Sequence, residues 1–178
     1  MNVNSNSKRN HILAAASFLV KTRGVEKLTL EAAAKEAGVS KGGLLHHFPS
    51  KEALIKGMVE EIATEFVTDI QDRVNRDTME NGKWSRAYLT STYEDIAGNG
   101  ISTALTAALF TNPELLGKLQ TQYAIWQRNL ENDGIDPVRS TLVRLAADGL
   151  WFAEMFGLGK LDDELREKVL RELSAMTE

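Results

Sequence analysis

The stretch from residue 29 to residue 48 holds side chains suited to contact with a polyanion. Thr29 and Ser40 stand where two short helices would begin, and each hydroxyl can accept a hydrogen bond from a backbone amide of the first turn. Lys41 can donate to a guanine edge or to a phosphate, and two histidines near the end of the stretch add ring nitrogens. The chemistry favoured here is non-covalent recognition of a nucleic acid.

The same stretch has the spacing of two short helices joined by a tight turn. Ala34 is small enough to let the helices approach closely, and Gly38 can take the left-handed conformation that the turn needs. Val39 is expected to pack inward, just before the second helix. Two helices joined in this way form a helix-turn-helix, which lays its second helix in the major groove of DNA. Tight corners of other all-α proteins show a similar pattern, so the residues alone leave both interpretations open.

Charge is distributed unevenly along the chain, whose net charge is -4. Residues 1–56 carry nine Lys or Arg against four Asp or Glu, whereas the remainder carries 12 basic and 21 acidic residues. A basic head on an acidic body indicates that the head meets a polyanion. The alternatives are an unevenly charged solvated surface, or a helical interaction module that uses its basic corner for a protein or membrane partner.

Composition places the chain among ordinary globular proteins. Its 178 residues are 43% hydrophobic and 26% charged, which excludes disorder and low complexity. Cysteine is absent, so disulfides, thiolate zinc sites and cysteine nucleophiles are excluded. The longest uncharged run, 96–113, is interrupted by Gly, Asn and Pro, and the apolar stretch 12–20 runs into Lys21 without a cleavage pattern. We therefore expect a cytoplasmic protein that does not enter a membrane.

Apolar residues recur with the period of a helix throughout, and no stretch alternates long enough to demand a strand. Capping residues and glycines divide the chain into about nine helices, expected at 7–23, 29–37, 40–47, 50–77, 83–97, 101–110, 112–132, 136–156 and from 162 onward, with 98–100 ending the fifth. The fold class predicted is all-α, with a three-helix N-terminal helix-turn-helix domain and a larger helical domain.

Residues 37–54, AGVSKGGLLHHFPSKEAL, closely resemble the signature of TetR-family transcriptional regulators, and the match extends over residues 7–67. The resemblance implies a homodimeric repressor that binds double-stranded operator DNA through residues 7–52. Residues 53–178 would then bind a small, largely apolar inducer and form the dimer. No cofactor is implied, and the inducer would make the protein release its operator.

Carried over by position, the family's DNA contacts fall in and around the expected helix 40–47. They are Thr29, Ser40, Lys41, Gly42, Gly43, Leu44, His46, His47 and Lys51. Two positions depart from the family pattern, because Gly43 replaces a common threonine and Leu45 replaces a tyrosine whose hydroxyl contacts phosphate. Operator discrimination is therefore expected to depend on His46, Lys41 and DNA shape.

All three Trp and all three Tyr lie beyond residue 83, where polar-tipped aromatics are typical of apolar ligand pockets. An ordinary helical core explains each residue separately, and the family resemblance favours a pocket for the set. The candidate pocket residues are Phe66, Trp84, Tyr88, Leu105, Leu109, Tyr123, Trp126 and Gln127.

The pattern of functional residues does not indicate an enzyme. The three histidines all precede residue 48, so a Ser-His-Asp triad in the larger domain is excluded. Successive helical residues point about 100° apart, so His46 and His47 do not converge on one metal ion. We expect neither a catalytic site nor a metal site.

The expected helix 136–156 is apolar on more than one face, which predicts burial on several sides. Two such helices, each paired with the last helix, would form a four-helix interface about a two-fold axis. The candidate interface residues are Leu150, Trp151, Met155, Leu165, Val169 and Leu173. The alternative is that 136–156 is the central core helix of a monomer.

Overall fold

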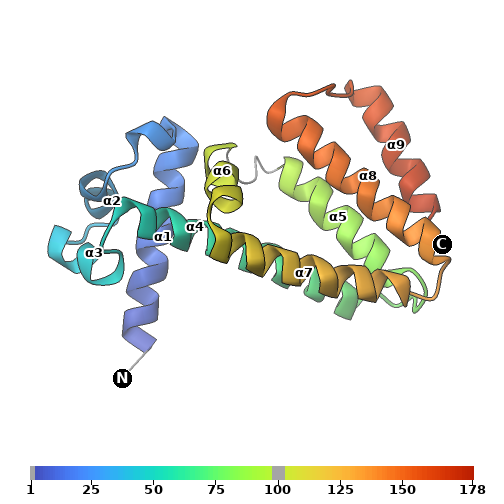
Figure 1. The fold of residues 1–178 in the computed structure, drawn as a ribbon, viewed down its shortest axis with the longest axis horizontal. Helices are drawn as coiled ribbons and strands as arrows, with labels where there is room; N and C mark the ends of the chain where they lie inside the picture. Colours follow the sequence, from blue (N-terminus) through green and yellow to red (C-terminus); the bar gives the residue numbers. More distant parts are fainter. Residues whose placement is uncertain (1–2, 98–102) are drawn as a thin grey trace. The chain divides into compact units, whose positions relative to one another are not determined.

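A computed structural model describes residues 3–97 and 103–178 of the chain (Figure 1). Over these residues the fold is entirely helical, as predicted, with one short 3-10 turn, η1 (Val25–Lys27). The α-helices are α1 (Val3–Arg23), α2 (Leu30–Glu36), α3 (Lys41–His47), α4 (Lys51–Arg76), α5 (Lys83–Ala97), α6 (Thr103–Thr111), α7 (Pro113–Glu131), α8 (Pro137–Phe156) and α9 (Asp163–Ala175).

Helix boundaries follow the local stop and start signals of the sequence. α5 and the end of α8 lie where predicted, and α8 ends at Phe156, followed by the capping residue Gly157 with a φ of 68°. α1 begins four residues earlier than expected, at Val3 rather than Ser7. The predicted stop at residues 98–100 and the predicted start at Ile101 lie outside the described residues.

The chain forms two compact units. Unit 1 contains residues 1–63 and 101–115, and unit 2 contains residues 64–100 and 116–178. The division falls inside α4, about a dozen residues after the boundary expected at residue 52. The α6 segment belongs with the helix-turn-helix unit rather than with the rest of the larger predicted domain.

Unit 1 is organised around the apolar face of α1. Its buried side chains come from α1, from the loop before α2, from α3 and from the first half of α4: Ile12, Leu13, Leu19, Leu28, Leu44, Leu54 and Met58. Arg9 lies over the ring of Phe48, with 5.4 Å between the guanidinium carbon and the ring centroid. This contact fixes the chain as it leaves α3.

Unit 2 is built on the packing of α5 against α8, which lie side by side (Figure 1), and α9 also contacts α5. Its core combines aliphatic and aromatic side chains from the second half of α4, α5, α7, α8 and α9: Ile70, Val74, Ala87, Tyr88, Leu89, Trp126, Val143, Ala147 and Leu173. The start of α5 is fixed by Asp133, whose side chain is almost completely buried. Among the helices described, none is long and apolar enough to cross a membrane.

Candidate nucleic-acid interface and ligand site

The two helices of the helix-turn-helix are capped by hydrogen bonds between residues close in sequence. Ala32 N–H donates to Thr29 Oγ1 (3.0 Å), which caps α2, and Gly43 N–H donates to Ser40 Oγ (3.1 Å), which caps α3. Gly38 takes a φ of 61° between the two helices, the left-handed conformation that glycine adopts without strain. The turn expected from the sequence therefore forms with the expected caps.

Most of α3 is presented to solvent. Lys41, Gly42, Gly43 and His46 are exposed, and His47 is half-buried. The rings of the two histidines meet edge to face, with 5.3 Å between centroids. The exposed surface that could meet DNA thus consists of one lysine, two glycines, the histidine pair and Leu45, whose side chain is 37% exposed.

Leu44 does not belong to that surface. Its side chain is completely buried in unit 1, where α3 packs against α2 and turns its apolar side inward. The side chain of Leu44 is therefore not exposed to DNA, and the contact predicted at this position stays a prediction. Lys51, at the first position of α4, is half-buried, and Ser50 Oγ accepts a bond from Ala53 N–H (3.1 Å).

Lys41 forms an ion pair that the sequence pattern did not indicate. Its ammonium lies 2.5 Å from a carboxylate oxygen of Glu31 on α2, and both side chains are more than half exposed. The hydrogen bond from Lys41 lowers the pKa of Glu31, and so do a bond from the backbone and the lysine charge. Glu31 is therefore ionised at neutral pH and sits beside the fixed cation of α3.

Four predicted pocket residues of unit 2 form an aromatic cluster. Trp126 lies at its centre, with ring centroids 5.6 Å from Phe66, 5.5 Å from Tyr88 and 5.2 Å from Tyr123, all in edge-to-face contact. Trp84 packs against the same core. Edge-to-face contacts place the positive rim of one ring on the negative face of the next, which adds to the burial energy.

The polar edge of this cluster converges on Asp148 of α8. Tyr88 Oη donates to Asp148 Oδ1 (2.6 Å), Tyr123 Oη donates to the same oxygen (3.1 Å), and Arg144 donates to Oδ2 (2.9 Å). Burial and the nearby carboxylate raise the pKa of Tyr123 to about 12, and the pKa of Tyr88 is raised further, chiefly by burial. Both phenols therefore remain protonated donors at physiological pH.

The other three predicted pocket residues have different surroundings. Gln127 accepts from Arg144 Nε (2.8 Å) and donates to Thr141 Oγ1 (3.0 Å), which links it to the polar edge of the cluster. Leu105 and Leu109 lie on α6 in unit 1, where Leu105 is buried and Leu109 half-buried. The structure thus brings six of the eight candidates together in unit 2.

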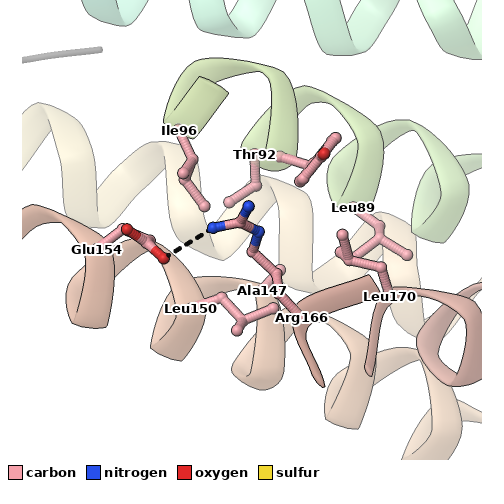
Figure 2. Close-up of a pocket in the computed structure, with 9 residues that line it drawn as sticks. Leu89, Thr92, Ile96, Ala147, Leu150, Glu154, Arg166 and Leu170 are labelled. Carbon is pink, nitrogen blue, oxygen red and sulfur yellow. Dashed lines mark hydrogen bonds and ion pairs between the residues drawn. The ribbon is translucent and has the colours of Figure 1, made fainter. Parts of the chain in front are cut away.

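Unit 2 also contains a small apolar recess between α5, α8 and α9 (Figure 2). Its volume is about 10 Å³, roughly that of one water molecule, so it does not hold an inducer in this conformation. Figure 2 shows Arg166 and Glu154 at this recess, joined by an ion pair of 3.3 Å. Thr92 also lines it, and its buried hydroxyl has no hydrogen-bond partner among the described residues.

Most of the residues predicted for the dimer interface contact their own unit. Leu173 is buried in the core, Val169 packs against it, and Leu150 lines the recess. Trp151 donates its indole N–H to Asp95 Oδ2 (2.8 Å), and Met155 is half-buried. Of the predicted set, Leu165 is the exposed member, at 47%.

A different face of α8 is exposed and apolar. Its side chains recur at intervals of three, four or seven residues, with Gly149 exposed between the third and fourth of them: Val138, Leu142, Leu145, Phe152 and Phe156. This set is named the α8 stripe below. The sequence showed that α8 is apolar on several faces, but it did not show which face α5 would cover.

Sequence reasoning also missed Asp148, Arg144 and Asp133. An aspartate between Ala147 and Leu150, in a helix with apolar residues on several faces, is the signal that marks Asp148. An arginine four residues earlier supports it, since positions i and i+4 share a helix face. No comparable local signal identifies Asp133, because its partners are far away in the sequence.

Family models match both parts of the chain. The model described as "Bacterial regulatory proteins, tetR family" matches residues 12–58, which contain α2 and α3. The model described as "Tetracyclin repressor-like, C-terminal domain" matches residues 82–178, more than half of the chain.

Curated relatives match mainly through part of their length. A nucleoid occlusion factor SlmA from Vibrio campbellii is 38% identical over 71 residues, which is 39% of this chain and 34% of the relative. The HTH-type transcriptional repressor KstR2 from Rhodococcus jostii is 34% identical over 102 residues, which is 55% of this chain and 48% of the relative. The chain thus spans about a third to a half of the length of these relatives.

Solved structures show the same fold along nearly the whole chain. A transcriptional regulator from Rhodococcus sp. Rha1 has a TM-score of 0.66 at 20% identity and covers 95% of both chains. The multidrug binding protein EbrR, complexed with malachite green, has a TM-score of 0.57 at 19% identity and covers 96% of this chain and 98% of EbrR. With its capped helix-turn-helix and its matched C-terminal domain, this chain belongs to the TetR family of bacterial regulatory proteins.

Proposed function

We propose that this protein is a homodimeric, ligand-responsive transcriptional repressor that binds operator DNA through α3. The observation that carries the proposal is the exposed face of α3, positioned by the Ser40 cap and by the left-handed turn at Gly38. A helix held in this way can enter the major groove with its first residues at the base edges. The basic charge of residues 1–56 supplies the attraction to phosphate.

The first experiment measures binding to the DNA that flanks the protein's own gene and to a mixed-sequence duplex, over a series of salt concentrations. Lys51→Ala should weaken binding to both by a similar factor and reduce the salt slope by about 1, as expected for one lost phosphate contact. His46→Ala should change the preference between the two duplexes, because a base contact carries sequence information.

Arg128→Ala is the matched control for these variants. It removes one exposed positive charge from α7, outside the helix-turn-helix, and should leave both affinities unchanged. Binding that does not depend on salt, or that responds to Arg128→Ala as strongly as to Lys51→Ala, contradicts recognition through α3. If the protein binds a lipid vesicle or a protein partner and does not bind DNA, the alternative of a helical interaction module is favoured.

The dimer interface that we propose is the α8 stripe. Its members are 37–66% exposed in the isolated chain, and they recur at the spacing that lines one side of a helix. A contiguous apolar face of this kind is unusual on a monomer, and two copies related by a two-fold axis would cover each other. The exposed Gly149 would let the two α8 helices approach closely at the centre of the stripe.

Sedimentation at low micromolar concentration tests the proposed interface. The wild type should sediment as a dimer, and the double variant Leu145→Glu, Phe152→Glu should sediment as a folded monomer, because it places charge at the centre of the apolar contact. Phe18→Glu is the control, since Phe18 is 51% exposed on α1 in unit 1. A wild-type monomer contradicts the dimer, and an unaffected double variant moves the interface away from the α8 stripe.

The inducer site that we propose is the aromatic cluster with its polar edge at Asp148. Aromatic walls with a few convergent polar groups are typical of small-molecule sites. The cluster is closed by its own edge-to-face contacts, so an inducer would have to separate the rings to enter. Such binding can release DNA only by favouring a conformation of the dimer in which the two helix-turn-helix domains no longer match the operator.

Adding small, largely apolar molecules to the protein–DNA complex tests this site, and malachite green, a largely apolar organic cation, is one of the molecules to be tested. A true inducer should lower DNA affinity about 5–150-fold. Tyr123→Phe should reduce its effect, because it removes one donor to Asp148 and keeps the ring. Tyr93→Phe is the matched control, since Tyr93 lies outside the cluster and is 37% exposed. An equal response in both variants contradicts the proposed site.

A further inference from the structure

The ion pair between Glu31 and Lys41 lies on the surface proposed to meet DNA. It joins the first turn of α2 to the first residue of α3, with 2.5 Å between the carboxylate oxygen and the ammonium. Both side chains remain more than half exposed, so the pair is in contact with water and can rearrange when another charged surface approaches.

Lys41 is the lysine of α3 and supplies the positive charge of this helix. The other residues of α3 are two glycines, two leucines and two histidines. Glu31 therefore neutralises the side chain on which α3 most depends for attraction to DNA. A free lysine would contact phosphate on any duplex, whereas this lysine must first exchange its carboxylate partner.

The free energy of that exchange depends on the base pair that the two side chains meet. An ion pair that is this exposed is weak, so the lysine can leave it. The carboxylate then stands beside a polyanion unless it finds a donor, and the donor that a base pair offers to a carboxylate is the N4 amino group of cytosine. The guanine of the same pair offers O6 and N7 to the lysine.

We propose that Glu31 is a specificity-determining residue, which with Lys41 reads a G·C pair in the major groove and disfavours DNA that has none at that position. This rests on the proposed DNA-binding function. The carboxylate accepts from cytosine while the ammonium donates to guanine, so one base pair satisfies both members of the ion pair. Elsewhere the carboxylate is left near phosphate without a donor, which weakens non-specific binding.

The test uses Glu31→Gln with two probes, a labelled mixed-sequence duplex and a pool of randomised duplexes from which bound molecules are sequenced. On the mixed-sequence duplex, the variant should bind about threefold to tenfold more tightly at 50 mM salt, and its salt slope should be steeper by about 1, because the released Lys41 now contacts phosphate. In the pool, the variant should lose a G·C preference that the wild type shows.

Glu36→Gln is the matched control, since Glu36 is exposed on the same helix and the change in charge is the same. It should leave the salt slope and the base preferences as they are. The double variant Glu31→Gln, Lys41→Gln should return the slope to the wild-type value, because Glu31 acts through Lys41. Circular dichroism of each variant checks that the helices remain folded.

Two outcomes overturn the proposal and are distinguishable from each other. If the wild type binds DNA with a normal salt dependence but Glu31→Gln behaves like Glu36→Gln, Glu31 is not a specificity residue and the DNA-binding function stands. If the wild type binds neither probe in a salt-dependent way, the proposed function itself fails, and the role of Glu31 fails with it.

Discussion

The first helix that lies wholly in unit 2, α5, is capped in a different way from the helices of unit 1. In unit 1, the hydroxyls of Thr29, Ser40 and Ser50 each accept from a backbone amide three residues later, at 3.0–3.1 Å. In unit 2, α5 is capped by Asp133, which lies 48 or 49 residues away from the amides that it accepts. The caps of unit 1 are thus neighbours in sequence, whereas α5 of unit 2 is capped through a tertiary contact.

The tertiary cap is also the more complete one. Asp133 accepts from the amide of Trp84 (2.9 Å) and from both the amide and the hydroxyl of Ser85 (2.8 Å each), and its side chain is 3% exposed. Its own carbonyl accepts from Gly82 N–H. A buried carboxylate with three donors forms a stable junction, but it forms only when α5 and the loop after α7 have already met.

This difference explains what the sequence could predict. A local cap and the amide that donates to it lie within one helical turn. The capping residues Thr29, Ser40 and Ser50 therefore predict the starts of three helices without any knowledge of the packing. α8 and α9 are also capped locally, by Asp136 and Asp162, and their starts were predicted as well. The all-α fold can therefore largely be predicted from local sequence signals.

The largest effect is expected at Gly82. Its φ is 76°, and a Cβ added there would meet the carbonyl oxygen of Thr177, near the C-terminus of the chain. Gly82→Ala should therefore cost about 2–5 kcal/mol, because it combines left-handed strain with overlap against backbone. Urea unfolding followed by circular dichroism measures the loss.

Gly38→Ala is the comparison from the other unit. Gly38 also has a positive φ, of 61°, but its Cβ would point into open space. The cost should be the strain alone, about 1–2 kcal/mol. Equal losses at the two glycines would show that the contact between Gly82 and Thr177 does not decide the stability of unit 2.

Asp133→Ala is expected to cost about 2–3 kcal/mol. It leaves two amides and a hydroxyl at the start of α5 without their acceptor in a buried position. Asp162→Ala is the control, because Asp162 is an exposed cap that accepts from the amide of Leu165, and its loss should cost about 1 kcal/mol. The free energy of unfolding in urea compares them, and similar losses contradict the special weight given to the tertiary cap.

Ser40→Ala is expected to cost about 1 kcal/mol, the usual value of a helix cap. The affected amide, that of Gly43, is exposed and can bond to water instead. Because α3 is short, its first turn should fray, and DNA affinity should fall more than stability does. Ser40→Asp restores the acceptor, so stability should recover, while the added charge next to Lys41 should keep DNA binding weak.

The sites were less predictable than the fold, for a physical reason. Which face of α8 is buried depends on where α5 packs, so the predicted interface residues Leu150 and Leu173 lie inside unit 2 while Leu145 and Phe152 are exposed. The burial of Leu44 has the same kind of cause, since it depends on how α3 packs within unit 1. Periodicity shows that a helix has an apolar face, but it does not name the partner.

The smallest effect on stability is expected at Asp95, where burial in the folded protein disfavours the ionised carboxylate. Burial raises the pKa of Asp95 above its ordinary value of 3.8, although the indole N–H of Trp151 donates to it and acts in the opposite direction. The folded protein thus holds this proton more tightly than the unfolded chain does. Ionised Asp95 therefore costs stability above its raised pKa, and the cost disappears as the pH falls towards 3.8.

Asp95→Asn removes the charge and keeps an acceptor for Trp151, so it should stabilise the protein at neutral pH by less than about 1 kcal/mol. The gain should shrink as the pH falls through the window above 3.8, because the wild-type carboxyl becomes neutral there. Glu94→Gln is the neighbouring control, since Glu94 is exposed and paired with Arg73, and its loss should bring no gain. Urea unfolding at a series of pH values measures both variants. A gain from Asp95→Asn that is the same at every pH would mean that burial of the charge is not its cause, and a loss at neutral pH would show that the ionised carboxylate stabilises the contact between α5 and α8.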